Sequence, residues 1–477
     1  MFRRTLAGLL AASLLTGCDM APRYVRPQLP VAPMLPAEVS QSGAAPEGAV
    51  EAPDLAWRDF FVEPRLREVI ALALANNRDL RVALANVEQA RALYRVQRAD
   101  IFPTLGASGS ATYQKMPGGI PNTGTGGGTA AGGSGRSDIY SASIGVSAWE
   151  IDLFGRVRNL SRAALEQYLA TSENRNAAQT ALIAEVATTW LTMAADQDRL
   201  AIAQKTEQAA AQTLELTRAR LAKGIASELD VRQAQTIFDQ ARVDIAQATT
   251  LVAQDRNALN LLAGTTVAAA MLPDGLGDRN ATLDRMPADL SSQILLRRPD
   301  IAAAEHQLRG ANANIGAARA AFFPNISLTA AFGTLSLGLS GLFEDGSSFW
   351  SAAPSATLPI FDFGRNTGNL RYAEATRDAM IAQYERAVQS AFREVADALA
   401  RRGTIDAQLT AQASLREAAS GAYRLSEARF RSGIDPFLTT LDSQRALYGA
   451  EQSLVATRLI REANAVELYR ALGGGLR

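Results

Sequence analysis

The sequence has few of the residues on which catalytic and metal sites depend. Its 477 residues include one cysteine, Cys18, and one histidine, His306, so the chain can form neither an internal disulfide nor a cysteine–histidine metal site. Lys plus Arg and Asp plus Glu are equal at 48 each, which leaves no basic field for nucleic acid. Aromatic residues make up only 6%, and the long segments are rich in Ala, Gln, Arg and Leu, as extended helices are.

No set of catalytic residues emerges either. His306 lies between Glu305 and Gln307 without partners at metal-ligand spacing, so we expect a solvated or hydrogen-bonded histidine. Gly473-Gly474-Gly475 does not open a helix, as a phosphate-binding loop would. The sequence therefore predicts no enzyme, no metal and no cofactor, and any energy coupling must come from other proteins.

The N-terminus has the pattern of a secretion signal. Arg3 and Arg4 precede an apolar run, residues 6–15, that is too short to span a bilayer. Leu15-Thr16-Gly17-Cys18 resembles the bacterial lipobox, which implies removal of residues 1–17 and acylation of Cys18; an incidental thiol is the alternative. Asp19 follows directly and resembles an inner-membrane retention signal of enterobacterial lipoproteins, so the lipid alone does not decide the membrane.

Three landmarks occur twice in the same order. They are Phe-Pro at 102–103 and 323–324, Phe-Gly-Arg at 154–156 and 363–365, and Gly-Ile at 224–225 and 433–434. Pro103 and Pro324 lie 221 residues apart, whereas both glycine pairs lie 209 apart. The constant second offset indicates an internal duplication, in which the first copy carries 12 extra residues between Phe-Pro and Phe-Gly-Arg.

Each copy contains two runs in which apolar and small polar residues alternate. The runs cover residues 104–114 and 139–148, and then 325–332 and 350–360, and each is about the ~9–11 residues that a tilted strand needs to cross a bilayer. The polar positions are mostly Ser, Thr and Gly, and aromatic residues gather at the ends: Phe102, Tyr113, Tyr140, Trp149, Phe322, Phe323, Phe349, Trp350, Phe361 and Phe363. This pattern favours outer-membrane strands, although an ordinary solvated hairpin with one face on a core is the alternative. Pro354 and Pro359 fit a strand end or a bulge better than a central strand.

Four strands cannot close a membrane-spanning barrel, and lipid does not tolerate open sheet edges. The membrane interpretation therefore requires other copies of the chain. The glycine-rich segment 116–136 is expected to be an extracellular loop rather than an interdomain linker, with the shorter segment 338–348 as its counterpart.

Long helices follow each pair of strands. The first helix is expected from Pro64 through Tyr94, and proline-free runs then cover 156–223 and 365–432, each ~100 Å long if continuous. Shorter helices are expected over 227–262 and 436–472. The domain organisation is then a signal peptide (1–17), an extended N-terminal and equatorial segment (18–63), a first repeat (64–290, hairpin 104–150, equatorial loop 264–290) and a second repeat (291–477, hairpin 325–361).

Several motifs together resemble the TolC family, in particular the outer-membrane lipoproteins of resistance–nodulation–division (RND) efflux pumps. They are Trp57-Arg58-Asp59-Phe60-Phe61, Ile151-Asp152-Leu153-Phe154-Gly155-Arg156, Arg256-Asn257-Ala258-Leu259, Arg297-Arg298-Pro299-Asp300-Ile301, Ile315-Gly316-Ala317-Ala318 and Leu468-Tyr469-Arg470-Ala471-Leu472. The resemblance implies an α+β fold and a homotrimer with one twelve-stranded outer-membrane β-barrel, four strands per chain. A periplasmic tunnel of long helices would continue the barrel, and residues 264–290 with both terminal segments would form an equatorial belt.

The implied function is that of a passive exit duct for small molecules. Its partners would be a periplasmic adaptor, an inner-membrane RND transporter and outer-membrane lipid. The channel of a type I protein secretion system is the alternative within the family. A lipid-anchored periplasmic coiled-coil scaffold, whose hairpins never insert, is the alternative outside it.

Leu438, Asp442 and Arg445 share one face of the last helix because they are four and three residues apart. By spacing alone, Asp442 and Arg445 would be an exposed ion pair worth about 0.2–0.5 kcal/mol. The resemblance instead implies that Leu438 and Asp442 line a periplasmic aperture that Arg445 helps to hold shut. By the offset of 209, the first-copy counterparts are Leu229, Gln233 and Thr236, so the charged pair occurs in one copy only.

The two Gly-Ile turns are the second candidate site. Gly224 and Gly433 have the position of glycines that end helices, and this role alone explains them. The resemblance implies that the turns, with Ile225 and Ile434 beside the glycines, also contact the adaptor.

Overall fold

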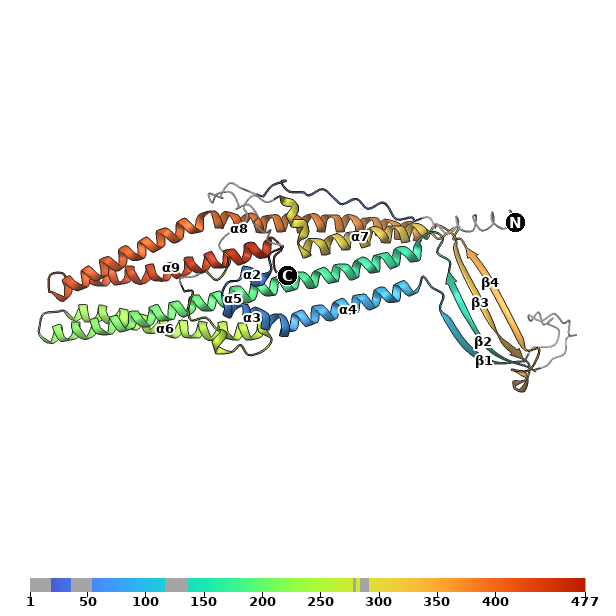
Figure 1. The fold of residues 1–477 in the computed structure, drawn as a ribbon, viewed down its shortest axis with the longest axis horizontal. Coiled ribbons are helices and arrows are strands. Elements are labelled where there is room, and N and C mark those ends of the chain that lie inside the picture. The colour runs from blue at the N-terminus through green and yellow to red at the C-terminus, as the bar shows by residue number, and fades with distance from the viewer. Residues whose placement is uncertain (1–18, 36–53, 116–135, 278–279, 284–290, 477) are drawn as a thin grey trace. The chain divides into compact units, whose positions relative to one another are not determined.

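The computed structural model describes residues 19–35, 54–115, 136–277, 280–283 and 291–476 (Figure 1). Two compact units emerge. The sheet unit consists of the described residues up to Arg26 and of those in Glu88–Leu169 and His306–Ile381. The hairpin unit consists of the described residues of Pro27–Val87, Ala170–Glu305 and from Ala382 onward. Each unit takes residues from both sequence repeats.

The strands of the sheet unit form one antiparallel sheet in chain order (Figure 1). They are β1 (Leu105–Lys115), β2 (Arg136–Glu150), β3 (Asn325–Ser336) and β4 (Ser348–Thr357). The register between β2 and β3 shifts at a bulge between Val146 and Trp149, a device that bends a strand locally. Within the chain, β1 and β4 are the edge strands.

The two faces of the sheet differ as the alternation predicts. On one face Ile144 lies opposite Ala107 and Phe332, and Phe332 lies opposite Trp350. On the other face the hydroxyls of Ser108 and Ser143 are 3.1 Å apart, and those of Ser110 and Ser141 are 2.8 Å apart. The sheet thus has an apolar face and a face of hydroxyls and glycines.

Pro354 lies inside β4, paired with Leu328 of β3. The expectation of a strand end or a bulge is therefore wrong for Pro354, although β4 is an edge strand within the described sheet, where proline is tolerated. Pro359 lies beyond the end of β4, at a strand end as expected. The short helix η4 (Leu339–Gly341) lies between β3 and β4, whereas the expected loop 116–136 lies outside the described residues except for its last position.

Two long helices begin at the Phe-Gly-Arg motifs. These are α5 (Arg156–Ala222) and α8 (Arg365–Arg431), each followed by an antiparallel partner, α6 (Glu228–Ala263) and α9 (Phe437–Ala471) (Figure 1). Gly155 and Gly364 have φ values of 79° and 87°, a left-handed conformation that glycine adopts without a steric penalty. The glycine of the motif thus makes the turn from sheet to helix in both repeats.

The single helix expected from Pro64 through Tyr94 is wrong. The segment forms α3 (Pro64–Asn76) and α4 (Arg78–Ala99), separated at the buried residue Asn77. Its Oδ1 accepts a hydrogen bond from the amide of Leu80 at 2.8 Å, and its Nδ2 donates to the carbonyl of Leu262 at 2.9 Å. The apolar periodicity of the sequence continues through the break and therefore does not reveal it. The break depends partly on a distant contact, between Asn77 and the end of α6. The second repeat breaks likewise between η3 (Ser292–Arg297) and α7 (Pro299–Ala320).

The N-terminal, equatorial and C-terminal segments meet in the core of the hairpin unit. Phe60, in the short helix α2 (Trp57–Phe60), stacks on Tyr469 with ring centroids 4.0 Å apart. The Tyr469 hydroxyl donates to the carbonyl of Leu55 at 2.6 Å, and Phe61 forms a β-bridge with Thr282. The equatorial belt that the family resemblance implies stays a prediction. Among the described helices, none has the length and apolar character needed to cross a membrane.

Candidate functional site: the paired helix tips

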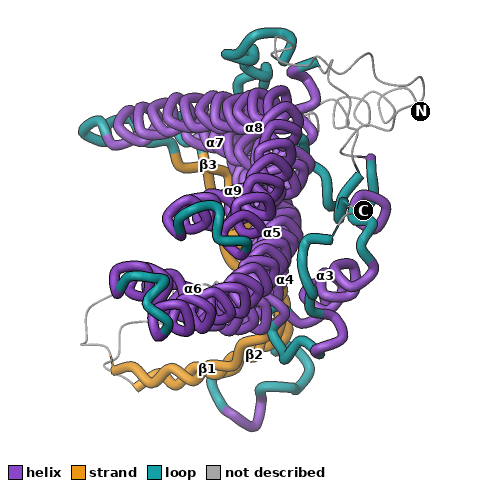
Figure 2. The backbone as a smooth tube through the Cα atoms, turned by 90° about the vertical axis from the view of Figure 1, so that its left-hand side faces the viewer, coloured by secondary structure: helices purple, strands orange, loops and turns teal. Residues whose placement is uncertain are grey.

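The α5–α6 and α8–α9 turns are here called the first and second tips (Figure 2), and they have the same backbone conformation. Gly224 and Gly433 both have a φ of 72°. The amide of Ile225 donates to the carbonyl of Arg220 at 2.9 Å, and the amide of Ile434 donates to that of Arg429 at 3.0 Å. With the second bonds made by the glycine amides, this is the Schellman ending of a helix.

The isoleucines of the tips remain exposed, Ile225 by 70% and Ile434 by 63%. In a Schellman ending, an apolar residue at this position often packs back against the last turn of its own helix. The residues available there are Arg220 and Arg429, whose guanidinium groups are engaged elsewhere. The two tips therefore present apolar side chains to solvent, and their contact with an adaptor stays a prediction.

A shared apolar cluster joins the two tips. Its buried members come from all four hairpin helices: Leu214, Val231, Ala234, Phe430, Phe437 and Leu441. The rings of Phe430 and Phe437 lie 5.4 Å apart. The guanidinium of Arg220 lies 4.4 Å from the centre of the Phe430 ring and donates to the carbonyl of Phe430 at 3.0 Å. Arg220 thus caps the end of α8 with a cation, which opposes the negative end of the helix dipole.

The proposed aperture residues lie on a face of α9 beside the one that joins this cluster. Phe437 and Leu441 are buried, whereas Leu438, Asp442 and Arg445 are exposed. Among the described residues, Asp442 and Arg445 form no ion pair and no side-chain hydrogen bond, with each other or with another residue. The i,i+3 ion pair that spacing alone predicts is therefore not formed, and both charged residues are exposed.

The first tip has a different set of side chains. Leu229 is exposed like Leu438, but Gln233 is uncharged and the Thr236 hydroxyl donates to the carbonyl of Arg232 at 2.9 Å. The start of α6 has a reciprocal capping box between Ser227 and Asp230, whereas Pro436 at the start of α9 provides no side-chain cap.

The sequence did not indicate three polar contacts in the hairpins. Arg220 binds across the tips, Arg429 pairs with Asp435 of its own tip at 2.6 Å, and the Tyr448 hydroxyl donates to Asp244 at 2.7 Å. Burial raises the pKa of Tyr448, and the hydrogen bond to Asp244 raises it further. The contacts of Arg220 and Tyr448 join the two repeats, whose packing a single sequence does not indicate locally, whereas Arg429 and Asp435 lie close together in one tip.

An acidic pair lies between α5 and α6, far along the chain from the tips. Burial raises the pKa of Asp255 to about 6, and the neighbouring carboxylate of Asp196 adds to the effect. Arg199 partly offsets it and pairs with Asp196 at 2.6 Å. By the offset of 209, the second repeat has Ile405 and Asn464 in place of the two acids.

The remaining residues singled out in the sequence are His306 and Cys18. His306 is hydrogen-bonded, with its Nδ1 2.6 Å from Glu166 Oε2. No group of His, Cys, Asp and Glu in the described ranges could hold a metal ion. Cys18 lies outside the described residues.

Comparisons with known proteins agree with the duplicated architecture. The Outer membrane efflux protein family matches residues 69–265 and again 290–474, so the starts of the two matches lie 221 apart and their ends 209 apart. Over 475 residues, covering 100% of this chain and 96% of the relative, the chain is 45% identical to the toluene efflux pump outer membrane protein TtgC of Pseudomonas putida. It is 42% identical to outer membrane protein OprJ of Pseudomonas aeruginosa, covering 98% of this chain and 95% of that protein.

Among solved structures, the open state of the MtrE outer membrane channel of Neisseria gonorrhoeae matches with a TM-score of 0.85 and 39% identity, covering 96% of this chain and 99% of that one. The CusC structure matches with a TM-score of 0.83 and 36% identity, covering 96% and 100%. The predicted fold, a four-stranded sheet and long helices in two repeats, is confirmed. The chain belongs to the Outer membrane efflux protein family.

Proposed function

We propose that the chain is the passive outer-membrane exit duct of a tripartite RND efflux pump that carries small molecules out of the cell. Its family membership and its 42–45% identity to outer membrane proteins of efflux pumps establish the outer-membrane efflux role. The structural observation that carries the proposal is a sheet with one apolar and one hydroxyl-bearing face, in a chain whose long helices end in exposed apolar tips. The small-molecule cargo is inferred from relatives named for toluene efflux.

The proposed assembly is a homotrimer. Among the described residues, no further strand pairs with either edge of the sheet, β1 or β4, and unpaired backbone groups are very costly in lipid. Pairing β4 of one copy with β1 of the next removes both edges, and three copies would give the twelve strands expected from the sequence. The apolar face would then contact lipid, and the hydroxyl face would line the lumen.

In the proposed closed state, Leu438 and Asp442 from three copies narrow the periplasmic aperture, and Arg445 neutralises the acidic ring. This assignment is supported by the exposure of all three side chains and by the lack of a partner for either charge within the described chain. In a constriction formed by three copies, Arg445 can reach a neighbouring copy. Like charges left without it would repel more strongly in a partly dehydrated site than in water.

The tips are the proposed contact for the periplasmic adaptor, which would connect the duct to the inner-membrane transporter. Ile225 and Ile434 are too exposed to contribute much to the protein's own packing, and the cluster beneath them fixes both tips on one surface. An adaptor that buried these isoleucines would remove apolar surface from water. Replacing both with Ser should weaken adaptor binding in a pull-down with purified components, while trimer formation stays intact.

The proposed function is tested with the purified full-length chain. A trimer that dissociates only on heating in a detergent gel, together with discrete single-channel currents in a planar bilayer, is the expected result. A soluble or monomeric chain without channel activity would favour the periplasmic scaffold instead. Restored efflux of small molecules in cells that lack their own outer-membrane duct separates drug efflux from protein secretion.

A further inference from the structure

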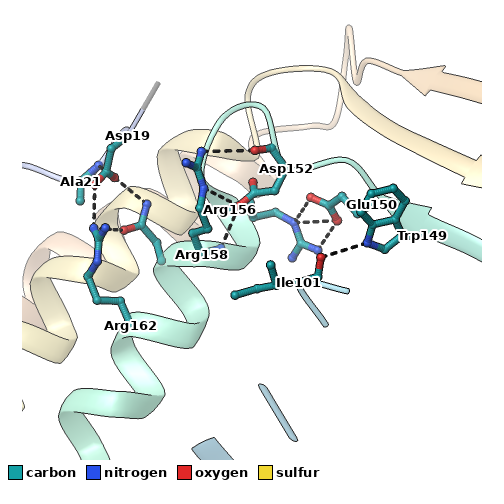
Figure 3. Close-up of polar contacts among 10 residues, drawn as sticks. Asp19, Ala21, Ile101, Trp149, Glu150, Asp152, Arg156, Arg158 and Arg162 are labelled. Carbon is teal, nitrogen blue, oxygen red and sulfur yellow. Dashed lines mark hydrogen bonds and ion pairs between the residues drawn. The ribbon is translucent and has the colours of Figure 1, made fainter. Parts of the chain in front are cut away.

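The first described residues of the sheet unit, 19–24, lie against α5 and α7 and are here called the strap. The Asp19 carboxylate accepts hydrogen bonds from Asn159 Nδ2 at 2.9 Å and from Arg162 Nη1 at 2.6 Å (Figure 3). Its Oδ1 also accepts from the amide of Ala21 at 3.1 Å. Both carboxylate oxygens of Asp19 are therefore occupied by donors, two of them from the first turns of α5.

Further contacts hold the strap to α7. Asn312 Nδ2 donates to the carbonyl of Pro22 at 2.7 Å, and the Arg309 guanidinium lies 5.1 Å from the centre of the Tyr24 ring. The strap is thus fixed along its length by side chains of two helices from different repeats.

Gly316 of α7 provides the space for the strap. A Cβ at this position would lie 2.7 Å from the amide nitrogen of Ala21 and 2.6 Å from Asn159 Nδ2, both closer than ordinary packing allows. Glycine is unfavourable inside a helix, so its presence here needs a reason, and the close passage of the strap supplies one. At Gly310 of the same helix, a Cβ would meet its nearest atoms at 3.5 Å, which is ordinary contact.

The docked carboxylate is ionised and held by charge. Partial burial raises the pKa of Asp19, but the hydrogen bonds from Arg162 and Asn159 outweigh it and lower the pKa to about 2. Asp19 directly follows Cys18 in the sequence, the residue that the lipobox resemblance predicts to be acylated. A carboxylate in this position resembles a signal that retains acylated proteins in the inner membrane, and here it is already bound within the protein.

We propose that docking of the strap withholds the Asp19 carboxylate from inner-membrane retention, so that the acylated chain passes to the outer membrane only once α5 and α7 have formed the seat for the strap. The inference rests on the acylation of Cys18. Asp19 is then a positioning residue whose effect depends on Gly316, Asn159 and Arg162. Sorting is thereby coupled to folding of the sheet unit.

The test uses the full-length chain in an enterobacterial host, labelled with radioactive palmitate and fractionated into inner and outer membranes. Gly316→Ala displaces the strap without changing any charge, and we expect the labelled chain to move from the outer to the inner membrane. Gly310→Ala, the matched control on the same helix, should remain in the outer membrane. Arg162→Ala, which removes the charged partner of Asp19, should shift the chain in the same direction as Gly316→Ala.

The double variant Asp19→Ser/Gly316→Ala decides between sorting and misfolding. Its return to the outer membrane supports the proposal, because the packing defect is still present and only the carboxylate is gone. Retention of the double variant in the inner membrane, or outer-membrane location of the single variant Gly316→Ala, would overturn it. A chain that takes up no palmitate but still forms channels would also overturn it, and would leave the exit-duct function standing.

Discussion

The two helix hairpins, α5–α6 and α8–α9, share a backbone and differ in their charges. Their tip glycines have the same φ of 72° and the same pair of capping hydrogen bonds, 209 residues apart. Yet Arg220 binds across to the end of α8, whereas its counterpart Arg429 binds Asp435 of its own tip.

The side chains at matched positions also differ between the hairpins. The first hairpin has Asp196 and Asp255 where the second has Ile405 and Asn464, and it has Gln233 and Thr236 where the second has Asp442 and Arg445. Duplication has therefore kept the residues that specify the backbone and allowed the other positions to take separate tasks.

The largest difference between the hairpins is expected in the stability lost when Phe430 or its counterpart Leu221 is replaced by alanine. Phe430 is buried in the cluster under both tips, so Phe430→Ala should cost about 3–5 kcal/mol in the local free energy of unfolding. Leu221 lies at the edge of that cluster, and Leu221→Ala should cost clearly less. Hydrogen exchange of the tip amides measures both, and equal losses would mean that the cluster does not depend on the second hairpin.

The tip glycines should show no such difference. Gly224→Ala and Gly433→Ala each force an L-residue into the left-handed conformation, at a cost of roughly 1–2 kcal/mol. No atom within 4 Å of either added Cβ would add a clash. Exchange of the amides in the last turns of α5 and α8 should increase to the same extent, and an effect confined to one tip would contradict the shared backbone.

A smaller effect is expected at the two arginines. Arg220→Ala removes a charged donor from the carbonyls of Phe430 and Arg431 and the cation over the Phe430 ring, for a loss of about 1 kcal/mol. Arg429→Ala removes a surface ion pair, which contributes little. Exchange rates at the end of α8 should therefore rise in the Arg220 variant and barely change in the Arg429 variant.

The acidic pair gives the hairpins different responses to pH. The pKa of Asp255 is raised from 3.8 to about 6 in the folded protein, so the folded state binds its proton more tightly than the unfolded state does. Stability from this group is present below the unfolded pKa and is lost as pH rises through the folded one. Asp255→Asn should remove this fall between about pH 4 and pH 6, as measured by the unfolding midpoint. An unchanged pH profile would show that Asp255 does not carry the effect.

The sequence predicted the features that short segments determine and missed those that depend on distant residues. Alternating residues and the glycines at 155, 224, 364 and 433 predicted the strands and helix ends, because pleating and positive φ are properties of short segments. The break at Asn77, the link from Arg220 and the seat of Asp19 were missed, because each needs a partner more than 100 residues away. The roles of Leu438, Asp442 and Arg445 were implied by family resemblance. The structure shows that all three side chains are exposed and that Asp442 and Arg445 do not form an ion pair with each other.

The most direct test of the proposed duct and aperture is single-channel conductance of the trimer with and without the charges on α9. Arg445→Ala should raise the conductance, since the acidic ring would lose its counter-charge and loosen, and Leu438→Ala should act in the same direction by removing bulk. Asp442→Ala should weaken block by multivalent cations. The matched first-copy variants Thr236→Ala, Leu229→Ala and Gln233→Ala should change conductance less. If Arg445→Ala and Asp442→Ala leave both conductance and cation block unchanged, the two charges are only a solvated helix face and the aperture lies elsewhere.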